Sequence, residues 1–157
     1  MLLKRLRDTM ARGGTPEETL GEVVRLVANE MVAEVCSIYL LRAGEVLELF
    51  ATQGLNPSAV HRTRLRVGEG LIGDIAAHAR PLTLDDAQTH PQFACRPETG
   101  EEIYHSLAGV PIVRSGRAWA AMSPTRPSPT RRRVRCTASG LRPWVANSSR
   151  TSPALSR

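Results

Sequence analysis

The sequence predicts an α+β domain in which an antiparallel sheet is flanked by helices. Two segments with helical periodicity open the chain, an apolar hairpin follows over residues 35–52, and a further apolar strand spans residues 107–114. Helices and strands of this kind bury their apolar faces by packing against each other in layers. With 157 residues, the chain is the size of one ordinary domain and can bury a core without metals or disulfides.

Both opening segments are predicted to be α-helices. Apolar residues at helical spacing between residues 2 and 10 form the first, and the glycine pair that follows ends it. The second begins with Thr15 as a capping residue, Pro16 in its first turn and Glu18 at the position of a capping box. We expect this helix to end near residue 33.

The hairpin supplies the centre of the predicted sheet. Residues 35–41 are apolar on both faces, which is typical of a well-buried strand, and residues 45–52 return antiparallel to them after a tight turn. Shorter elements are predicted to follow: a helical turn at 58–61, extended segments at 64–67 and 81–84, a small helix at 71–79, a long polar loop at 85–100, a helical turn at 101–105 and a strand at 107–114.

The composition of the chain changes sharply after Gly116. All 15 acidic residues lie before that point, whereas residues 117–157 contain nine Arg and no Lys, Asp or Glu. Residues 117–122 could still form a return strand, but the Pro-, Ser-, Thr- and Arg-rich remainder cannot bury enough apolar surface to fold. We therefore expect a folded domain over residues 1–117 and a disordered tail over residues 118–157, with the sheet incomplete at its C-terminal strand and helix.

The tail allows two further hypotheses. Its Arg residues would attract nucleic-acid phosphates without sequence preference, although such contact need not be functional. An Arg-rich, acid-free composition is also common when a G+C-rich gene is translated in the wrong frame, so a frameshift near Arg117 is the second hypothesis. Salt-sensitive DNA binding that removal of the tail abolishes would support the first hypothesis, and the encoding DNA tests the second.

Several chemical classes receive no support from the sequence. No run of about 18 apolar residues occurs, so no membrane span is expected. The four histidines are scattered and no Cys-x-x-Cys pair occurs, so neither a metal site nor a bound cofactor is predicted. No nucleophile and base can be assembled into a catalytic arrangement, so no catalytic residue is predicted. Without a signal peptide, the expected location is the cytoplasm.

The segment from Gly68 to Gly73 matches the Gly-x-Gly-x-x-Gly pattern of dinucleotide-binding loops. The helix predicted after it is too short for a crossover unit of about 30 residues. Arg62, Arg64 and Arg66 alternate in the preceding segment, where a buried parallel strand should be apolar on both faces. We therefore interpret the glycines as a turn into a short helix.

Several motifs together resemble a GAF domain. They are the segments 54–57, 68–73, 85–91, 97–101 and 109–112, which read GLNP, GEGLIG, DDAQTHP, PETGE and GVPI. The second and the last recur in GAF domains generally. The PETGE stretch is more specific and resembles the N-terminal GAF domain of the nitrogen-type phosphoenolpyruvate-protein phosphotransferases. The resemblance covers about residues 1–117.

The resemblance implies a PAS-like sheet with a ligand pocket between the sheet and the loops over one face. The effector would be an unidentified small molecule, and the opening helices would offer a surface for a homodimer. Pockets of this type are mostly apolar with a few convergent polar groups. The expected lining comes from the hairpin, the small helix and the segment around the last strand: Ser37, Tyr39, Leu49, Ala51, Ile72, Ile75, Tyr104 and Leu107.

In that family, the domain senses nitrogen status and controls phosphoryl transfer from phosphoenolpyruvate by later domains. The resemblance therefore implies a regulatory fragment of a phosphotransferase that is not itself an enzyme. Two alternatives stay open: a GAF-fold methionine-sulfoxide reductase and the GAF domain of a nitrogen-regulatory transcriptional activator. The reductase needs loop thiols that can meet, and the sequence places Cys36 in a strand, Cys95 in a loop and Cys136 in the tail.

Overall fold

The described residues form a six-stranded antiparallel sheet with helices on both faces. This computed structural model describes residues 1–115 and 117–125. The helices are α1 (Leu2–Ala11), α2 (Pro16–Met31) and α3 (Gly70–His78). The strands are β1 (Val35–Arg42), β2 (Val46–Gln53), β3 (Arg64–Arg66), β4 (Leu82–Leu84), β5 (Leu107–Arg114) and β6 (Arg117–Thr125). Hydrogen-bonded neighbours follow the order β3-β2-β1-β6-β5-β4.

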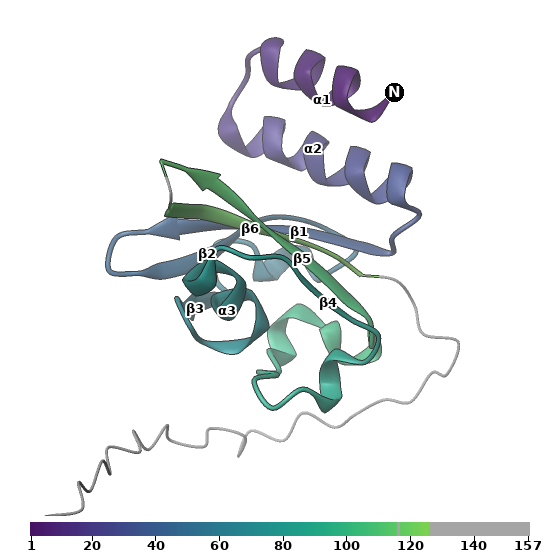
Figure 1. Cartoon of the computed structure of the whole chain (residues 1–157). Helices are drawn as coiled ribbons and strands as arrows, with labels where there is room; N and C mark the ends of the chain where they lie inside the picture. The colour runs from purple at the N-terminus through teal and green to yellow at the C-terminus, as the bar shows by residue number, and fades with distance from the viewer. Residues whose placement is uncertain (116, 126–157) are drawn as a thin grey trace, which may run out of the picture.

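The sheet separates two layers (Figure 1). Helix α2 lies across one face and α1 stacks on α2, whereas α3 and the loop that joins β4 to β5 lie on the opposite face. We call these the α2 face and the loop face. The arrangement confirms the predicted fold class. Among the described helices, none combines the length and apolar character that crossing a membrane requires.

Helix α2 begins at the predicted capping box. The Thr15 hydroxyl accepts a hydrogen bond from the Glu18 backbone N–H at 3.2 Å, and the Glu18 carboxylate accepts one from the Thr15 N–H at 3.1 Å. These bonds satisfy donors that the first turn of a helix otherwise leaves without a partner. The helix ends at Met31, because Val32 adopts a left-handed backbone conformation.

The described part of the sheet includes a strand that follows residue 116. Strand β6 lies in the centre of the sheet, paired with β1 on one side and β5 on the other. The return strand predicted at residues 117–122 forms and continues to Thr125, so the boundary predicted after residue 117 falls inside a strand. The backbone N–H and C=O groups of β1 and β5 need hydrogen-bond partners, and β6 supplies them. The small side chain of Ala118 leaves room for α3 to pack against β6. The remainder of the predicted tail, and the question of a C-terminal helix, lie outside the described residues.

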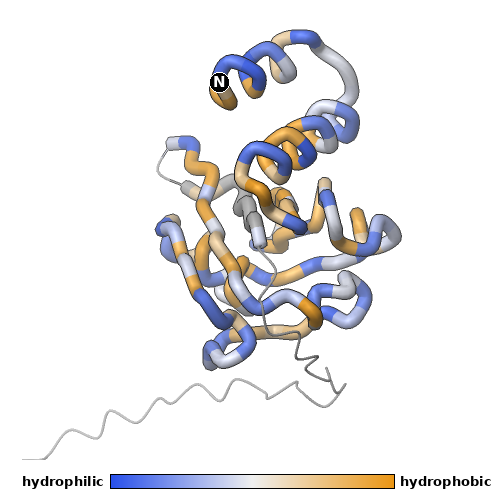
Figure 2. The backbone as a smooth tube through the Cα atoms, turned by 90° about the vertical axis from the view of Figure 1, so that its right-hand side faces the viewer, coloured by the Kyte–Doolittle hydropathy of each residue, from blue (hydrophilic) through white to orange (hydrophobic). Residues whose placement is uncertain are grey.

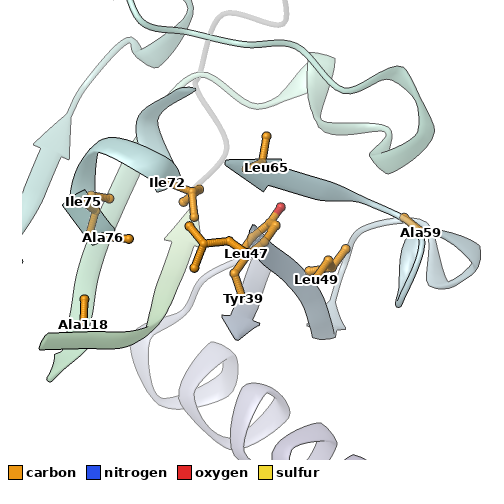
Figure 3. Close-up of a cluster of buried hydrophobic side chains, with 9 residues drawn as sticks. All are labelled: Tyr39, Leu47, Leu49, Ala59, Leu65, Ile72, Ile75, Ala76 and Ala118. Atoms are coloured by element: carbon orange, nitrogen blue, oxygen red, sulfur yellow. The ribbon is translucent and has the colours of Figure 1, made fainter. Parts of the chain in front are cut away.

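Each face of the sheet has its own apolar core. On the α2 face, residues of α2, β1 and β2 pack together: Val23, Val24, Val27, Ala28, Cys36, Ile38, Phe50 and Ala51. On the loop face, a second cluster joins the hairpin to α3 and β6 (Figure 3): Tyr39, Leu47, Leu49, Ala59, Leu65, Ile72, Ile75, Ala76 and Ala118. Figure 2 shows the hydrophobic colours concentrated where α2 meets the strands. Strand β1 is buried from both sides, as its apolar sequence predicted.

A β-bulge in the hairpin decides which residues face which layer. Ile38 pairs with Ala51, whereas the next residue, Tyr39, pairs with Leu49, so Phe50 is the extra residue. As a result, Phe50 and Ala51 both pack on the α2 face. Strict alternation from Leu49 would have placed Ala51 on the loop face, which is why it was expected in a pocket there.

Candidate functional site

A small cavity lies on the loop face, bounded by β1, α3 and the loop that joins β4 to β5. Its volume is about 50 Å³, enough for a few atoms of a small molecule. Five of the eight residues expected to line a pocket surround it: Ser37, Tyr39, Ile72, Tyr104 and Leu107. Seven more complete the lining: Val35, Leu55, Ala87, Phe93, Glu101, Ser106 and Thr125.

The other three expected residues lie away from the cavity. Leu49 and Ile75 are completely buried in the loop-face core, where Figure 3 shows Leu49 close to Tyr39 and Ile75 on α3. Ala51 lies on the α2 face because of the bulge. These three side chains therefore belong to the apolar cores and do not line the cavity.

The residues that sequence reasoning missed come mostly from the loop between β4 and β5. Ala87, Phe93, Glu101 and Ser106 lie in or beside segments without periodicity, so no pattern indicated which side chains point inward. Val35 could have been found, because it lies at alternate spacing with Ser37 and Tyr39 on β1. Thr125 lines the cavity because it lies opposite Val35 in the pairing of β1 with β6.

An ion pair and several hydrogen bonds hold the loop between β4 and β5 over the sheet. Arg96 forms an ion pair with Glu69 at the start of α3. The completely buried Thr99 donates its hydroxyl to the Arg96 carbonyl at 2.7 Å, and its own carbonyl accepts the Asn56 N–H at 3.0 Å. The Ala87 N–H bonds to the carbonyl of His105 at 2.6 Å. The loop that covers one side of the cavity is therefore held at several points.

The glycine motif shapes the turn from β3 into α3. Gly68 and Gly70 have φ angles of +87° and +65°, in the region that favours glycine. A Cβ atom at Gly73 would lie 2.5 Å from the carbonyl oxygen of Arg66, so only glycine fits without a backbone shift. This geometry supports the interpretation of the motif as a structural turn.

Among the described residues that line the cavity, Glu101 is the one with a carboxyl side chain. One carboxylate oxygen accepts a hydrogen bond from the Arg96 backbone N–H at 3.2 Å. Burial raises the pKa of Glu101 to about 7, and the negative charge of Glu98 adds to the rise, whereas hydrogen bonds from the Arg96 backbone and Thr99 and the Arg96 charge oppose it. The carboxyl group is thus poised to exchange a proton near neutral pH.

Hydroxyl groups provide the rest of the polar lining. Burial, together with the charges of Glu101 and Glu98, raises the pKa of Tyr39 far above its ordinary range, so this phenol stays neutral. The Ser37 hydroxyl shares a hydrogen bond of 2.8 Å with Thr52 on the neighbouring strand. An apolar cavity with a few convergent polar groups is the usual form of a small-molecule site.

The described residues offer little for covalent or metal chemistry. Cys36 packs on the α2 face, and burial raises the pKa of its thiol to about 12, which makes it a poor nucleophile. Within residues 1–115 and 117–125, no group of three or more His, Cys, Asp or Glu side chains could hold a metal ion.

Comparisons with known proteins agree with this architecture. The family model described as "GAF domain" matches residues 15–138. The GAF domain of a phosphoenolpyruvate-protein phosphotransferase from Coxiella burnetii superposes with a TM-score of 0.71 at 35% sequence identity, covering 81% of this chain and 78% of that one. The phosphoenolpyruvate-dependent phosphotransferase system protein of Escherichia coli K12 is 33% identical over 117 residues, which are 72% of this chain but 16% of that protein.

A second kind of relative is a Nif-specific regulatory protein. The Nif-specific regulatory protein of Azospirillum lipoferum is 33% identical over 103 residues, which are 64% of this chain and 16% of that protein. The chain thus spans about one sixth of the length of both kinds of relative. From the family match, the sheet topology and the loop-covered cavity, the chain belongs to the GAF domain family, and its domain is homologous to that of the phosphoenolpyruvate phosphotransferases.

Proposed function

We propose that the chain is a regulatory module that senses a small molecule in the loop-face cavity and carries out no reaction itself. The observation that carries this proposal is the cavity, because it brings Ser37, Tyr39, Ile72, Tyr104 and Leu107 together beneath a tethered loop. A ligand there would contact both the sheet and the loop, and it would favour the conformation in which they are closed together.

A binding titration with a cavity-filling variant tests this proposal. Small amines, alcohols and carboxylic acids would be titrated at millimolar concentration into the ¹⁵N-labelled chain, and amide shifts would be followed by NMR. We expect at least one of them to shift the amides of Ser37 and Ser106, and Ala87→Val, which fills the cavity, to abolish the effect. The exposed Thr83→Val on β4 serves as the matched control. Shifts that survive Ala87→Val would contradict the proposed site.

We further propose that the chain is a fragment of a cytoplasmic phosphoenolpyruvate-protein phosphotransferase and regulates phosphoryl transfer in nitrogen signalling. The similarity to the Coxiella and Escherichia proteins supports this reading. The encoding DNA tests it. We expect a shifted frame beyond codon 116 to resume an acidic helix and to continue into a phosphohistidine domain. If no frame continues in this way, the assignment to a transferase is wrong.

The GAF domain of a nitrogen-regulatory transcriptional activator is the second candidate, and the 33% identity to the Nif-specific regulatory protein favours it. The same DNA distinguishes the two candidates. A continuation that lacks a phosphohistidine domain but encodes a DNA-binding domain would favour the activator.

We also propose a homodimer through the N-terminal helices. Leu3 and Met10 lie seven positions apart on one side of α1 and are 81% and 64% exposed, which is unusual for large apolar side chains on one surface. Light scattering should give twice the chain mass, and Leu3→Glu with Met10→Glu should give the monomer mass. A monomer in the parent chain would contradict this proposal.

A further inference from the structure

The charge of the cavity indicates what kind of ligand it accepts. Of the described residues that line it, Glu101 carries the ionisable carboxyl group, and none is Lys, Arg or His. The cation whose charge acts on Glu101 is Arg96, which does not line the cavity. One terminal nitrogen of its guanidinium group pairs with Glu69, and its Nε is buried without a hydrogen-bond partner among the described residues. An anionic ligand would therefore meet a carboxylate and no cation among the described residues that line the cavity.

The hydrogen bonding of Glu101 leaves acceptor capacity for a ligand. An ionised carboxylate offers about four acceptor positions. The structure provides a backbone donor from Arg96 at 3.2 Å and a hydrogen bond from the Thr99 side chain. By contrast, the carboxylate of Glu48 on the hairpin accepts hydrogen bonds from the guanidinium groups of Arg42 and Arg64 at 3.1 Å each. It also shares a hydrogen bond of 3.0 Å with Nδ1 of His61. Buried carboxylates are stable when they are paired, and Glu48 shows how this chain pairs one.

We propose that the cavity selects a small ligand with an ammonium or similar cationic N–H group, which pairs with Glu101 while its apolar part packs on Ile72, Phe93 and Leu107. This inference rests on the proposed sensing function and names the chemical class of the effector. The Tyr39 and Tyr104 side chains surround the same space and supply hydroxyl groups for the remaining polar atoms of the ligand.

The proposal predicts a pH dependence with a definite sign. Glu101 must be ionised to pair with a cation, and its pKa of about 7 reflects burial and the charge of Glu98, opposed by Arg96. Other titratable groups near it are Tyr39, which stays neutral, and Glu69, which holds Arg96. Affinity for a cation should therefore fall about tenfold between about pH 8 and pH 6, because the ionised fraction falls by that factor. Affinity for an anion would rise over the same interval.

Three probes of equal carbon length test the proposal: propylammonium, 1-propanol and propionate, titrated into the ¹⁵N-labelled chain at about pH 8. Ligands of this size reach millimolar affinity at best. We expect propylammonium to bind at least about tenfold more tightly than propanol, since an ion pair in a water-poor site adds that much. Glu101→Gln should remove the advantage, Glu101→Asp should retain part of it, and Asp85→Asn, an exposed loop carboxyl outside the cavity, should change nothing.

The outcomes separate this inference from the function on which it rests. If propanol binds in the cavity and propylammonium binds no better, or propionate binds best, the ligand class is wrong while the cavity remains a binding site. If none of the probes shifts the amides of Ser37 or Ser106, the cavity itself is not a binding site and both proposals fall. Dispersed amide spectra of each variant show that it is folded.

Discussion

The two faces of the sheet differ in how closely their apolar side chains are packed and in how fully their polar groups are hydrogen-bonded. The α2 face is a closed apolar core in which Val24 and Cys36 are completely buried. At the margin of that face, the side chain of Glu48 is only 9% exposed and pairs with the cations of Arg42 and Arg64 and with the ring of His61. The loop face combines an apolar core with a cavity, and the cavity contains a carboxyl group with a raised pKa.

This difference separates stability from binding within one sheet. A fully packed face stabilises the fold, whereas a face that keeps a cavity and a poorly paired carboxyl group loses some stability and gains a place for a ligand. The shared strands β1 and β6 connect the two, so occupation of the loop face can reach α2 and α1 through the sheet. The comparison can be tested by equivalent substitutions on the two faces.

The largest expected effect comes from truncating one isoleucine on each face. Ile38→Ala on the α2 face should lower the free energy of unfolding by about 3 to 4 kcal/mol, because the packed core cannot close around the space. Ile72→Ala beside the cavity should cost less, about 2 kcal/mol, because the new space joins an existing one. Urea unfolding measures both. Equal losses would remove the distinction between the faces.

Glu101→Gln should stabilise the protein at alkaline pH. A carboxyl group whose pKa is higher in the folded state, about 7 against 4.5, contributes stability below about pH 4.5 and loses it as the pH rises to about 7. The Gln variant lacks this loss, so above pH 7 it should be more stable by about 1 to 3 kcal/mol, with no difference near pH 4.5. Chemical unfolding at a series of pH values measures the two curves. Parallel curves would mean that Glu101 is not perturbed.

Glu48→Gln should have the opposite sign. The hydrogen bond to His61, and the hydrogen bonds and charges of Arg42 and Arg64, hold the pKa of Glu48 below its usual value of 4.5. Its contribution is therefore present above about pH 4.5 and is lost in acid. Because the cations are partly exposed, we expect a loss of about 1 to 2 kcal/mol at pH 7. The same unfolding series would contradict the account if the variant were equally destabilised at pH 3.

The smallest effect concerns the hydroxyl pair on the loop face. Ser37→Ala removes a hydrogen bond of 2.8 Å to Thr52 and should cost about 1 kcal/mol. Thr52→Val removes the other partner, and a double-mutant cycle isolates the interaction between them. Additive losses would show that the two hydroxyl groups do not interact.

Local patterns in the sequence were sufficient for much of this fold. The capping box of Thr15 and Glu18 and the doubly apolar strand at residues 35–41 act over short distances, and both appear as predicted. Strand β6 was underestimated because its place between β1 and β5 depends on backbone pairing, not on its own side chains. Ala51 was misplaced because a bulge cannot be seen in alternation. Glu101 was missed because a loop has no period that shows which side chains point inward.

The central claim is that the carboxyl groups of Glu48 and Glu101 differ because the two faces differ. A ¹³C NMR titration of the Glu side-chain carboxyl carbons tests it most directly, with Glu48→Gln and Glu101→Gln used to assign the signals. We predict that Glu101 titrates with a midpoint near pH 7 and Glu48 with a midpoint below 4.5. If both titrate together near pH 4.5, the loop face holds no poised carboxyl group and the account is contradicted.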